Sequence, residues 1–152
     1  MKQLNRTSIT ILVLVCAILG GCGRGERSTK LFVMVPKGVH PYYEPCFEGF
    51  RDAGSNYGIT VEYQAPLNFE LPQQVKVLED LVARQVDGIA ISAVDNEGLV
   101  PVIKDAMASG IKVLTFDAPA PASDSLSYIG TMNETAGYAA GEYLAGLLPE
   151  GG

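Results

Sequence analysis

The sequence predicts an α/β fold built on a parallel sheet. Two observations lead to this prediction: short apolar runs alternate with helical patterns along most of the chain, and the first run, Leu31–Val35, is apolar without interruption. A continuous apolar run is typical of a strand covered on both faces, and helices between strands allow the right-handed crossovers of a parallel sheet. With 47% hydrophobic and 18% charged residues, the 152-residue chain can bury the core of one ordinary domain.

Further strands are predicted wherever a short apolar or β-prone run recurs. They are expected at Thr60–Tyr63, Ile89–Ser92, Val113–Phe116 and, as a short strand, Tyr128–Gly130. The segment Ala118–Ser127 between the last two is small, polar and proline-containing. This composition favours an extended crossing segment over a helix or strand.

Helices are predicted between and after these strands, over Tyr43–Tyr57, Leu71–Arg84, Glu97–Ser109 and Asn133–Leu148. Gly58 and Gly110 end the first and the third. In the first helix, Phe47, Phe50 and Tyr57 stand near helical spacing. One face is expected to comprise Val75, Leu78 and Val82, with Leu81 beside them, in the second helix, and Val102, Ile103, Ala106 and Met107 are expected to face inward in the third. In the last helix, the spacing of Gly137 and Gly141 indicates close packing on a neighbouring element.

Ligands of parallel sheets bind at the carboxyl ends of the strands, so the candidate site residues should follow Val35, Ser92 and Phe116. In the loop after the first strand, the adjacent Tyr42 and Tyr43 offer flat apolar faces with polar edges. Such side chains suit a sugar ring, which has an apolar face and a hydroxyl rim. The alternative is that one tyrosine packs under the loop while the other is solvated.

Polar residues near the other strand ends extend this candidate site. Asp117 follows the fourth strand, where its carboxylate can accept hydrogen bonds from two adjacent hydroxyls or can cap a turn. Asn133 opens the last helix, where helix capping and hydroxyl binding are both open. His40 in the first loop is either a ligand contact or an ordinary loop residue. Gln74, like its neighbour Gln73, opens the second helix and is a candidate to face the cleft.

Several classes of function are disfavoured by what the sequence lacks. The net charge of −6 argues against nucleic acid binding. The first loop, PKGVHPYY, lacks the GxGxxG of a dinucleotide enzyme, and neither a Ser-His-Asp arrangement nor zinc-ligand spacing occurs. We therefore expect no enzyme, cofactor or metal site. Cys46 is expected to be a small buried apolar residue, and Asp95 to cap the third helix, with a supporting ligand role as the alternative.

A targeting segment precedes the domain. Lys2 and Arg6 stand before the apolar stretch Ile9–Leu19, which is shorter than the roughly 20 residues of a membrane span and fits a signal peptide. The stretch leads into Leu-Gly-Gly-Cys, which resembles the bacterial lipobox. We therefore expect residues 1–21 to be removed, Cys22 to carry a lipid anchor, and the polar residues 22–29 to form a tether.

In these positions and their order, the chain resembles the type 1 periplasmic binding proteins, in particular the ribose-binding-like sugar receptors of ABC importers. The resemblance covers roughly residues 31–148. It rests on an ordered series of segments: His40-Pro41-Tyr42-Tyr43, Asp87–Ser92, Val94-Asp95, Gly110–Asp117, Tyr128–Thr131 with Asn133, Ala136-Gly137 and Ala140-Gly141. The resemblance implies a Rossmann-like lobe, a monosaccharide-like ligand and a permease partner, in a non-enzymatic, extracytoplasmic protein.

The resemblance also implies roles for individual residues. Tyr42 and Tyr43 match the family's ring-contacting aromatics, Asp117 matches its hydroxyl-binding aspartate, and Asn133 lies where the second lobe starts. The sequence departs from the family's pattern at several positions, which leaves fewer polar ligand contacts: Ala118 and Pro119 replace an Arg or a Ser-Asp pair, Ser125 a common Arg, Met132 a common Asp, and His40 a common Asn.

Members of that family have two lobes and are much longer. The resemblance therefore implies a first lobe over 30–117, a crossing segment over 118–131 and an incomplete second lobe over 132–152, in a fragment that cannot close around its ligand. A receptor for a membrane sensor kinase or chemoreceptor is an alternative function on the same fold. A transcription repressor of this fold would need an amino-terminal DNA-binding module, and the export signal occupies that place.

Overall fold

The computed structural model of the chain describes residues 29–148. The predicted signal peptide, the predicted lipidation site Cys22, almost all of the predicted tether and the last four residues lie outside the described residues. Within them, five strands form one parallel sheet in the order β2-β1-β3-β4-β5. The strands are β1 (Leu31–Val35), β2 (Thr60–Tyr63), β3 (Gly88–Ile91), β4 (Lys112–Phe116) and β5 (Tyr128–Ile129). The predicted parallel α/β fold is confirmed.

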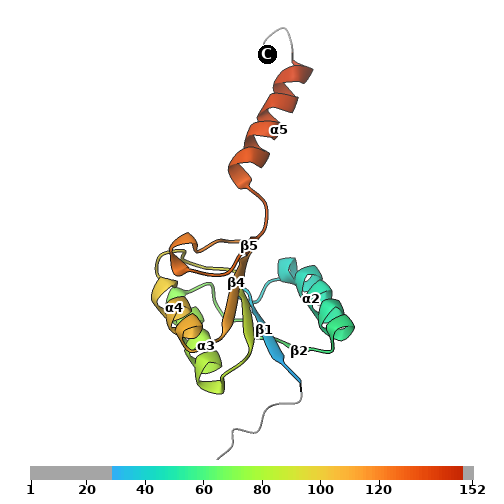
Figure 1. Cartoon of the computed structure of the whole chain (residues 1–152). Coiled ribbons are helices and arrows are strands. Elements are labelled where there is room, and N and C mark those ends of the chain that lie inside the picture. The colour runs from blue at the N-terminus through green and yellow to red at the C-terminus, as the bar shows by residue number, and fades with distance from the viewer. Residues whose placement is uncertain (1–28, 149–152) are drawn as a thin grey trace, which may run out of the picture.

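Helices cover the two faces of this sheet unequally. They are η1 (Pro41–Tyr43), α2 (Glu44–Tyr57), α3 (Leu71–Arg84), α4 (Val100–Ala108), η2 (Pro121–Ser123) and α5 (Asn133–Leu147). Helices α3 and α4 lie side by side on one face, and α2 lies on the other (Figure 1). Helix α5 projects away from the edge at which the strands end (Figure 1).

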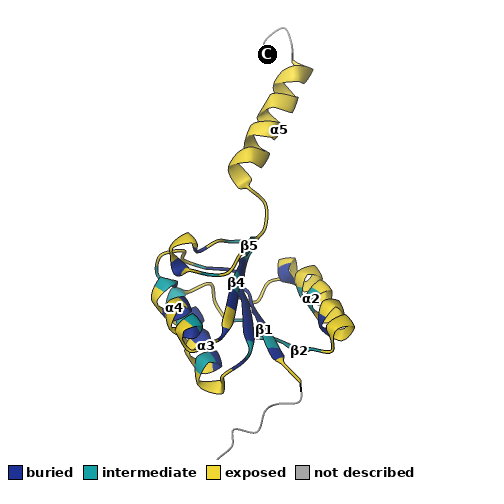
Figure 2. Cartoon of the chain, in the orientation of Figure 1, coloured by how far each residue is buried: buried dark blue, intermediate teal, exposed yellow. Residues whose placement is uncertain are grey.

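The hydrophobic core lies between the sheet and the α3–α4 layer (Figure 2). Leu78 and Leu81 of α3 and Ile103 of α4 are almost completely buried, and they belong to one cluster with the inward residues of β1, β3 and β4. The predicted inward faces of α3 and α4 are therefore confirmed. Parallel sheets are stable only when helices cover their faces. Packing of α3 and α4 therefore holds β1, β3 and β4 in place, and with them the positions of the strand ends.

Helix α2 makes a looser layer. Its ring contact is Phe47 against Tyr63, with centroids 5.0 Å apart, and Gly54 lets it approach β2 so closely that a β-carbon there would lie 2.6 Å from Val61 Cγ1. Tyr57, at the end of the helical spacing that begins with Phe47, does not pack on the sheet, because this side chain is 80% exposed. The predicted burial of Cys46 is wrong, since a groove separates this part of α2 from the sheet and leaves the thiol exposed.

The third predicted helix starts later in the structure than the sequence predicts, because local hydrogen bonds form a turn before it. Helix α4 begins at Val100 and not at Glu97, because the Asp95 carboxylate accepts hydrogen bonds from the backbone N–H groups of Glu97 (3.0 Å) and Gly98 (2.8 Å). These bonds form a turn in front of the helix. The prediction that Asp95 caps the helix itself is therefore wrong, because the N-cap residue of α4 is Leu99 and Asp95 caps the preceding turn. The same two bonds lower the pKa of the Asp95 carboxyl group.

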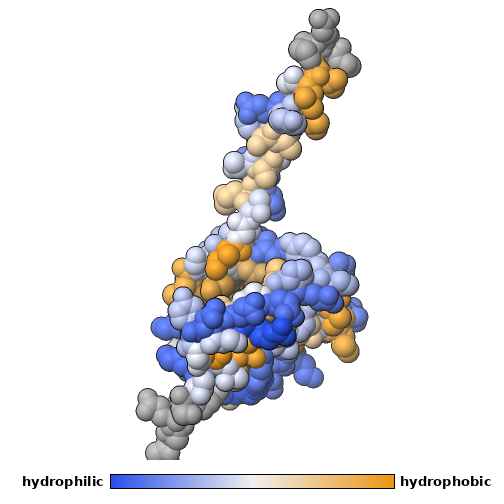
Figure 3. Space-filling view, turned by 90° about the vertical axis from the view of Figure 1, so that its right-hand side faces the viewer, coloured by the Kyte–Doolittle hydropathy of each residue, from blue (hydrophilic) through white to orange (hydrophobic). Residues whose placement is uncertain are grey.

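The segment after β4 is only partly extended. It contains the single helical turn η2 and then β5, which pairs in parallel with the end of β4. Helix α5 follows, and all its residues are exposed. Apart from the adjacent residues and the helix's own backbone, no described atom lies within 4 Å of a β-carbon placed at Gly137 or Gly141. The close packing predicted for these glycines therefore has no partner in the described part of the chain. Hydrophobic side chains along α5 stand clear of the lobe (Figure 3).

Candidate ligand-binding site

The candidate site lies at the carboxyl edge of the sheet, where β1, β3 and β4 end next to one another. The β1–η1 loop brings Lys37 to this edge, and η1 brings Tyr42 and Tyr43; β3 is followed by Ser92, and β4 is followed by Asp117. In a parallel sheet the ends of neighbouring strands meet at one edge, which is why residues up to 80 positions apart converge.

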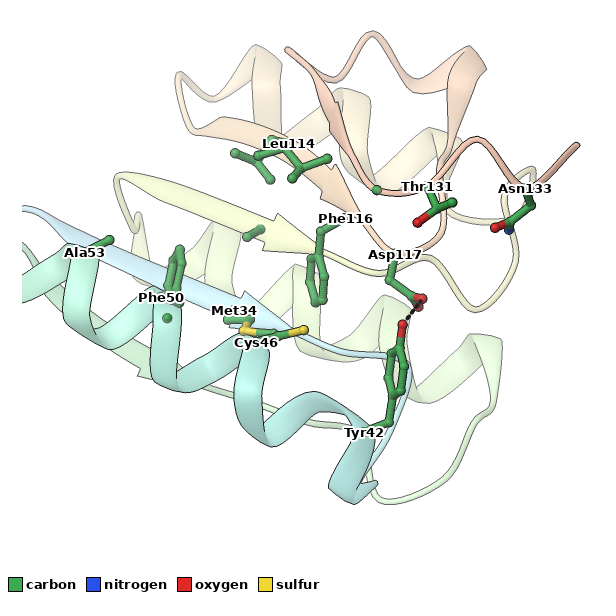
Figure 4. A pocket seen from close by; sticks show the side chains of 14 residues that line it. Met34, Tyr42, Cys46, Phe50, Ala53, Leu114, Phe116, Asp117, Thr131 and Asn133 are labelled. Carbon is green, nitrogen blue, oxygen red and sulfur yellow. Dashed lines mark hydrogen bonds between the residues drawn. The ribbon is translucent and has the colours of Figure 1, made fainter. Parts of the chain in front are cut away.

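The Asp117 carboxylate accepts hydrogen bonds from Tyr42, Tyr43 and Ser92 and forms an ion pair with Lys37. Its Oδ2 accepts from Ser92 Oγ (2.7 Å) and Tyr43 OH (3.2 Å) and lies 3.4 Å from Lys37 Nζ. Its Oδ1 accepts from Tyr42 OH alone among the described residues, at 3.2 Å (Figure 4). An ionised carboxylate has about four lone-pair positions, two on each oxygen. Oδ2 is therefore saturated, and Oδ1 retains room for one more donor.

The Asp117 backbone is held as firmly as its side chain. Its φ of 57° lies in the left-handed region, which aspartate tolerates better than most non-glycine residues. The Asp117 N–H donates to Ile129 O (3.1 Å), and the Asp117 carbonyl accepts from Tyr128 OH (3.0 Å). Such a conformation persists only where the surroundings over-determine it, and it recurs at functional sites.

The charge of Asp117 is stabilised in the folded protein. Burial raises the pKa of its carboxyl group, but the hydrogen bond from Ser92, the charge of Lys37 and the hydrogen bond from Tyr42 together lower the pKa below its usual value. The carboxylate is therefore ionised at neutral pH. Because Lys37 lies beside it, the site as a whole is close to electrically neutral.

The two tyrosines have different environments. Tyr43 is 3% exposed, and its ring stands edge-on to Tyr42 (5.1 Å) and Phe116 (6.1 Å). Burial is the main cause that raises the pKa of Tyr43. Tyr42 is 59% exposed, and its hydrogen bond to Asp117 raises its pKa, so that the hydroxyl stays a donor. Tyr42 thus offers an accessible ring, while the buried Tyr43 donates a hydrogen bond to the carboxylate.

A groove of about 610 Å³ opens beside this cluster (Figure 4). Its polar end is lined by Asp117, Tyr42, Thr131 and Asn133. It continues between α2 and the sheet over apolar side chains, among them Met34, Cys46, Phe50, Leu114 and Phe116. The groove therefore combines one polar end with a long apolar floor.

Of the other predicted site residues, some line the groove and some do not. Asn133 lines the polar end of the groove, as the first residue of α5. His40 does not line it: its Nδ1 accepts from the backbone N–H of Tyr42 (3.1 Å), which caps η1, and its ring stands edge-on to Phe69. Gln73 bonds to Asn68 and Glu70 outside the groove.

Gln74 does not face the groove. From the sequence it is a candidate to face the cleft, but its side chain is completely buried, and its amide makes three hydrogen bonds to backbone groups. The second helix turns this residue inward, toward the strand ends, because it lies one turn before the core residue Leu78 on the same helix face.

Two residues of the cluster, Ser92 and Lys37, were not predicted as site residues. Ser92 was recognised only as the last residue of a predicted strand, yet a polar residue that ends an apolar run at the ligand-binding edge is itself a signal. Lys37 belongs to the first loop, and nothing local to the sequence indicates that it pairs with Asp117. Within residues 29–148, no group of three or more His, Cys, Asp or Glu residues could hold a metal ion, and no helix is long and apolar enough to cross a bilayer.

Comparison with known proteins finds a family model and several binding proteins of ABC transporters that are similar to this chain. A family model described as a periplasmic binding protein domain matches residues 31–152. An ABC transporter solute-binding protein from Burkholderia graminis C4D1M, solved in complex with D-arabinose, is 36% identical over 82% of this chain and 43% of its own, with a TM-score of 0.77. A sugar-binding protein of a sugar ABC transporter from Bacillus halodurans is 34% identical over 80% of this chain and 42% of its own, with a TM-score of 0.75.

A curated relative agrees with these structures. The D-ribose/D-allose-binding protein of Pseudomonas aeruginosa is 31% identical over an alignment of 84 residues, which covers 51% of this chain and 26% of the relative. The chain thus spans less than half the length of each of these three relatives.

The lowered pKa of Asp117 predicts a specific pH dependence of stability. A depressed carboxyl pKa stabilises the folded state above the unfolded value of about 3.9, and this contribution is lost as pH falls through the folded pKa. Asp117→Asn lacks this contribution. In urea unfolding, the free-energy difference between wild type and variant should be largest near neutral pH and should shrink below about pH 4.

The matched control is Asp52→Asn, which changes an exposed carboxylate of α2. It should leave the pH profile of the unfolding free energy almost unchanged. A difference between wild type and Asp117→Asn that stays constant from neutral pH to about pH 2 would contradict the stabilised charge.

Proposed function

The chain belongs to the periplasmic binding protein family, and on that basis we propose that it is the sugar-binding component of an ABC uptake system. The ligand is a monosaccharide-like molecule held at the carboxyl edge of the sheet. The observation that supports this most is the Asp117 carboxylate, which is fixed by four side chains and keeps one acceptor position open on Oδ1 beside the groove. The relatives named above for D-arabinose and for D-ribose and D-allose support a small sugar as ligand.

The charge balance favours a neutral polyhydroxylated ligand. An isolated carboxylate would attract cations, but Lys37 offsets the charge of Asp117. A sugar hydroxyl that donates to Oδ1 forms a charge-assisted hydrogen bond, which is worth about 1.5–3 kcal/mol. The exposed ring of Tyr42 offers the apolar surface for the face of the sugar ring, and Thr131 and Asn133 add polar groups at the same end of the groove.

The proposed protein binds without chemical conversion and acts outside the cytoplasm. Its lipid anchor is Cys22, and its partner is the permease of the importer. A receptor that reports ligand occupancy to a sensor kinase or chemoreceptor would use the same site. Reconstitution with a permease separates the two roles, because only the uptake component increases sugar transport.

Sugar binding should depend on the charge of Asp117. We expect D-ribose, D-allose or D-arabinose to bind the chain weakly, with a Kd of about 1 mM, because the open groove covers only one side of a sugar ring. Amide chemical shifts near Asp117, Tyr42 and Ser92 should change in an NMR titration. Asp117→Asn keeps the size of the side chain and should weaken binding at least about tenfold.

Asp80→Asn, which alters an exposed carboxylate of α3, serves as the control and should bind as wild type does. Equal affinity of wild type and Asp117→Asn would refute the assignment of the site. Absence of shift changes with any of the three sugars would refute the choice of ligand class.

Lipid attachment should depend on Cys22 alone. Cys22→Ser removes the thiol that accepts the lipid, so the variant should incorporate no labelled palmitate and should leave the membrane fraction. Cys16→Ser, within the predicted signal peptide, should behave as wild type. Palmitate incorporation into the Cys22→Ser variant would disprove the lipid anchor.

A further inference from the structure

One buried amide connects the two loops that surround Asp117. Gln74 lies in the first turn of α3 and has no exposed surface. Its Nε2 donates to Pro36 O (2.9 Å) and to Ser92 O (2.8 Å), and its Oε1 accepts from the backbone N–H of Val94 (2.9 Å). Both amide protons and the carbonyl oxygen of one side chain are thus used on backbone groups.

These backbone groups belong to the loops that carry the donors to Asp117. Pro36 directly precedes Lys37, at the start of the loop that leads to Tyr42 and Tyr43 in η1. Ser92 itself donates to Asp117. The amide therefore ties the end of β1 to the end of β3 at the point where their side chains turn toward β4.

We propose that Gln74 is a positioning residue of the binding site, whose amide sets the spacing between the β1–η1 loop and the β3–α4 loop so that their donors converge on Asp117. Its effect on sugar affinity rests on the function proposed above. Its effect on the Asp117 carboxylate does not, because those contacts exist without a ligand.

The chemistry of a glutamine suits this task. The two carbonyl oxygens need donors, and the Val94 N–H needs an acceptor, so only a group with both functions satisfies all three. Methionine has a similar size but no N–H, and glutamate directs lone pairs at the two carbonyls when ionised. Either change leaves buried backbone groups unpaired, which the loops can relieve only by moving apart.

A purely structural role is the competing explanation, and the ionisation of Asp117 distinguishes the two. Ser92 and Lys37 lower the pKa of this carboxyl group, and both are placed by the loops that Gln74 joins. If Gln74 positions them, its loss must raise the Asp117 titration midpoint. If it only stabilises the core, the midpoint in the folded variant stays where it was.

The experiment follows the Asp117 side-chain carboxyl by ¹³C NMR during a pH titration of the chain, in wild type, Gln74→Met and Gln74→Glu. Gln73→Met makes the same chemical change one residue earlier, outside the groove, and Leu78→Ala removes core packing from the same helix. We expect the Asp117 midpoint to rise in both Gln74 variants and to stay at the wild-type value in both controls. Sugar affinity should fall about tenfold in Gln74→Met and remain unchanged in Gln73→Met.

An unchanged Asp117 midpoint in a folded Gln74 variant would overturn the proposal. So would a failure of both Gln74 variants to fold, which would make the residue essential for folding alone. A raised midpoint in a chain that binds no sugar would support the positioning role and reject the proposed function, so the two failures are distinguishable.

Discussion

The need to compensate one partly buried negative charge organises the carboxyl edge of this sheet. A carboxylate removed from water is costly unless it is paired and hydrogen-bonded. Asp117 meets this requirement with donors from the end of β1, the residue after β3 and the η1 turn. The three strand ends are thereby held in one arrangement, and Asp117, which keeps an acceptor position open on Oδ1, lines the groove.

The same residue also fixes where the chain goes next. The left-handed backbone of Asp117 turns the chain away from β4, and its N–H and carbonyl are bonded to Ile129 and Tyr128 of β5. The Tyr128 hydroxyl also donates to Thr131 O, at 3.3 Å. The start of α5, with Asn133, is thus placed relative to the carboxylate, so site geometry and the direction of the exit helix depend on common contacts.

The spacing of apolar residues and the position of polar residues at strand ends made much of this fold and site predictable from the sequence. The β1, β3 and β4 runs and the core faces of α3 and α4 follow from apolar patterning, and the location of Asp117 follows from the rule for ligand sites in parallel sheets. Apolar patterning does not predict contacts between elements that are distant in the sequence. Whether Gln74 faces a cleft or the core depends on how α3 rotates against the sheet, and the Lys37–Asp117 pair joins residues far apart in sequence. Cys46 lies where a groove separates α2 from the sheet.

The account stands on Asp117 as the acceptor for a sugar hydroxyl, and a crystal structure of the chain grown with concentrated D-arabinose tests this most directly. We expect a sugar ring against Tyr42, with one hydroxyl within hydrogen-bond distance of Asp117 Oδ1, and with Ser92, Tyr43 and Lys37 still bonded to Oδ2. A structure in which the Asp117 carboxylate points away from the tyrosines, or in which the sugar occupies a different surface, would contradict it.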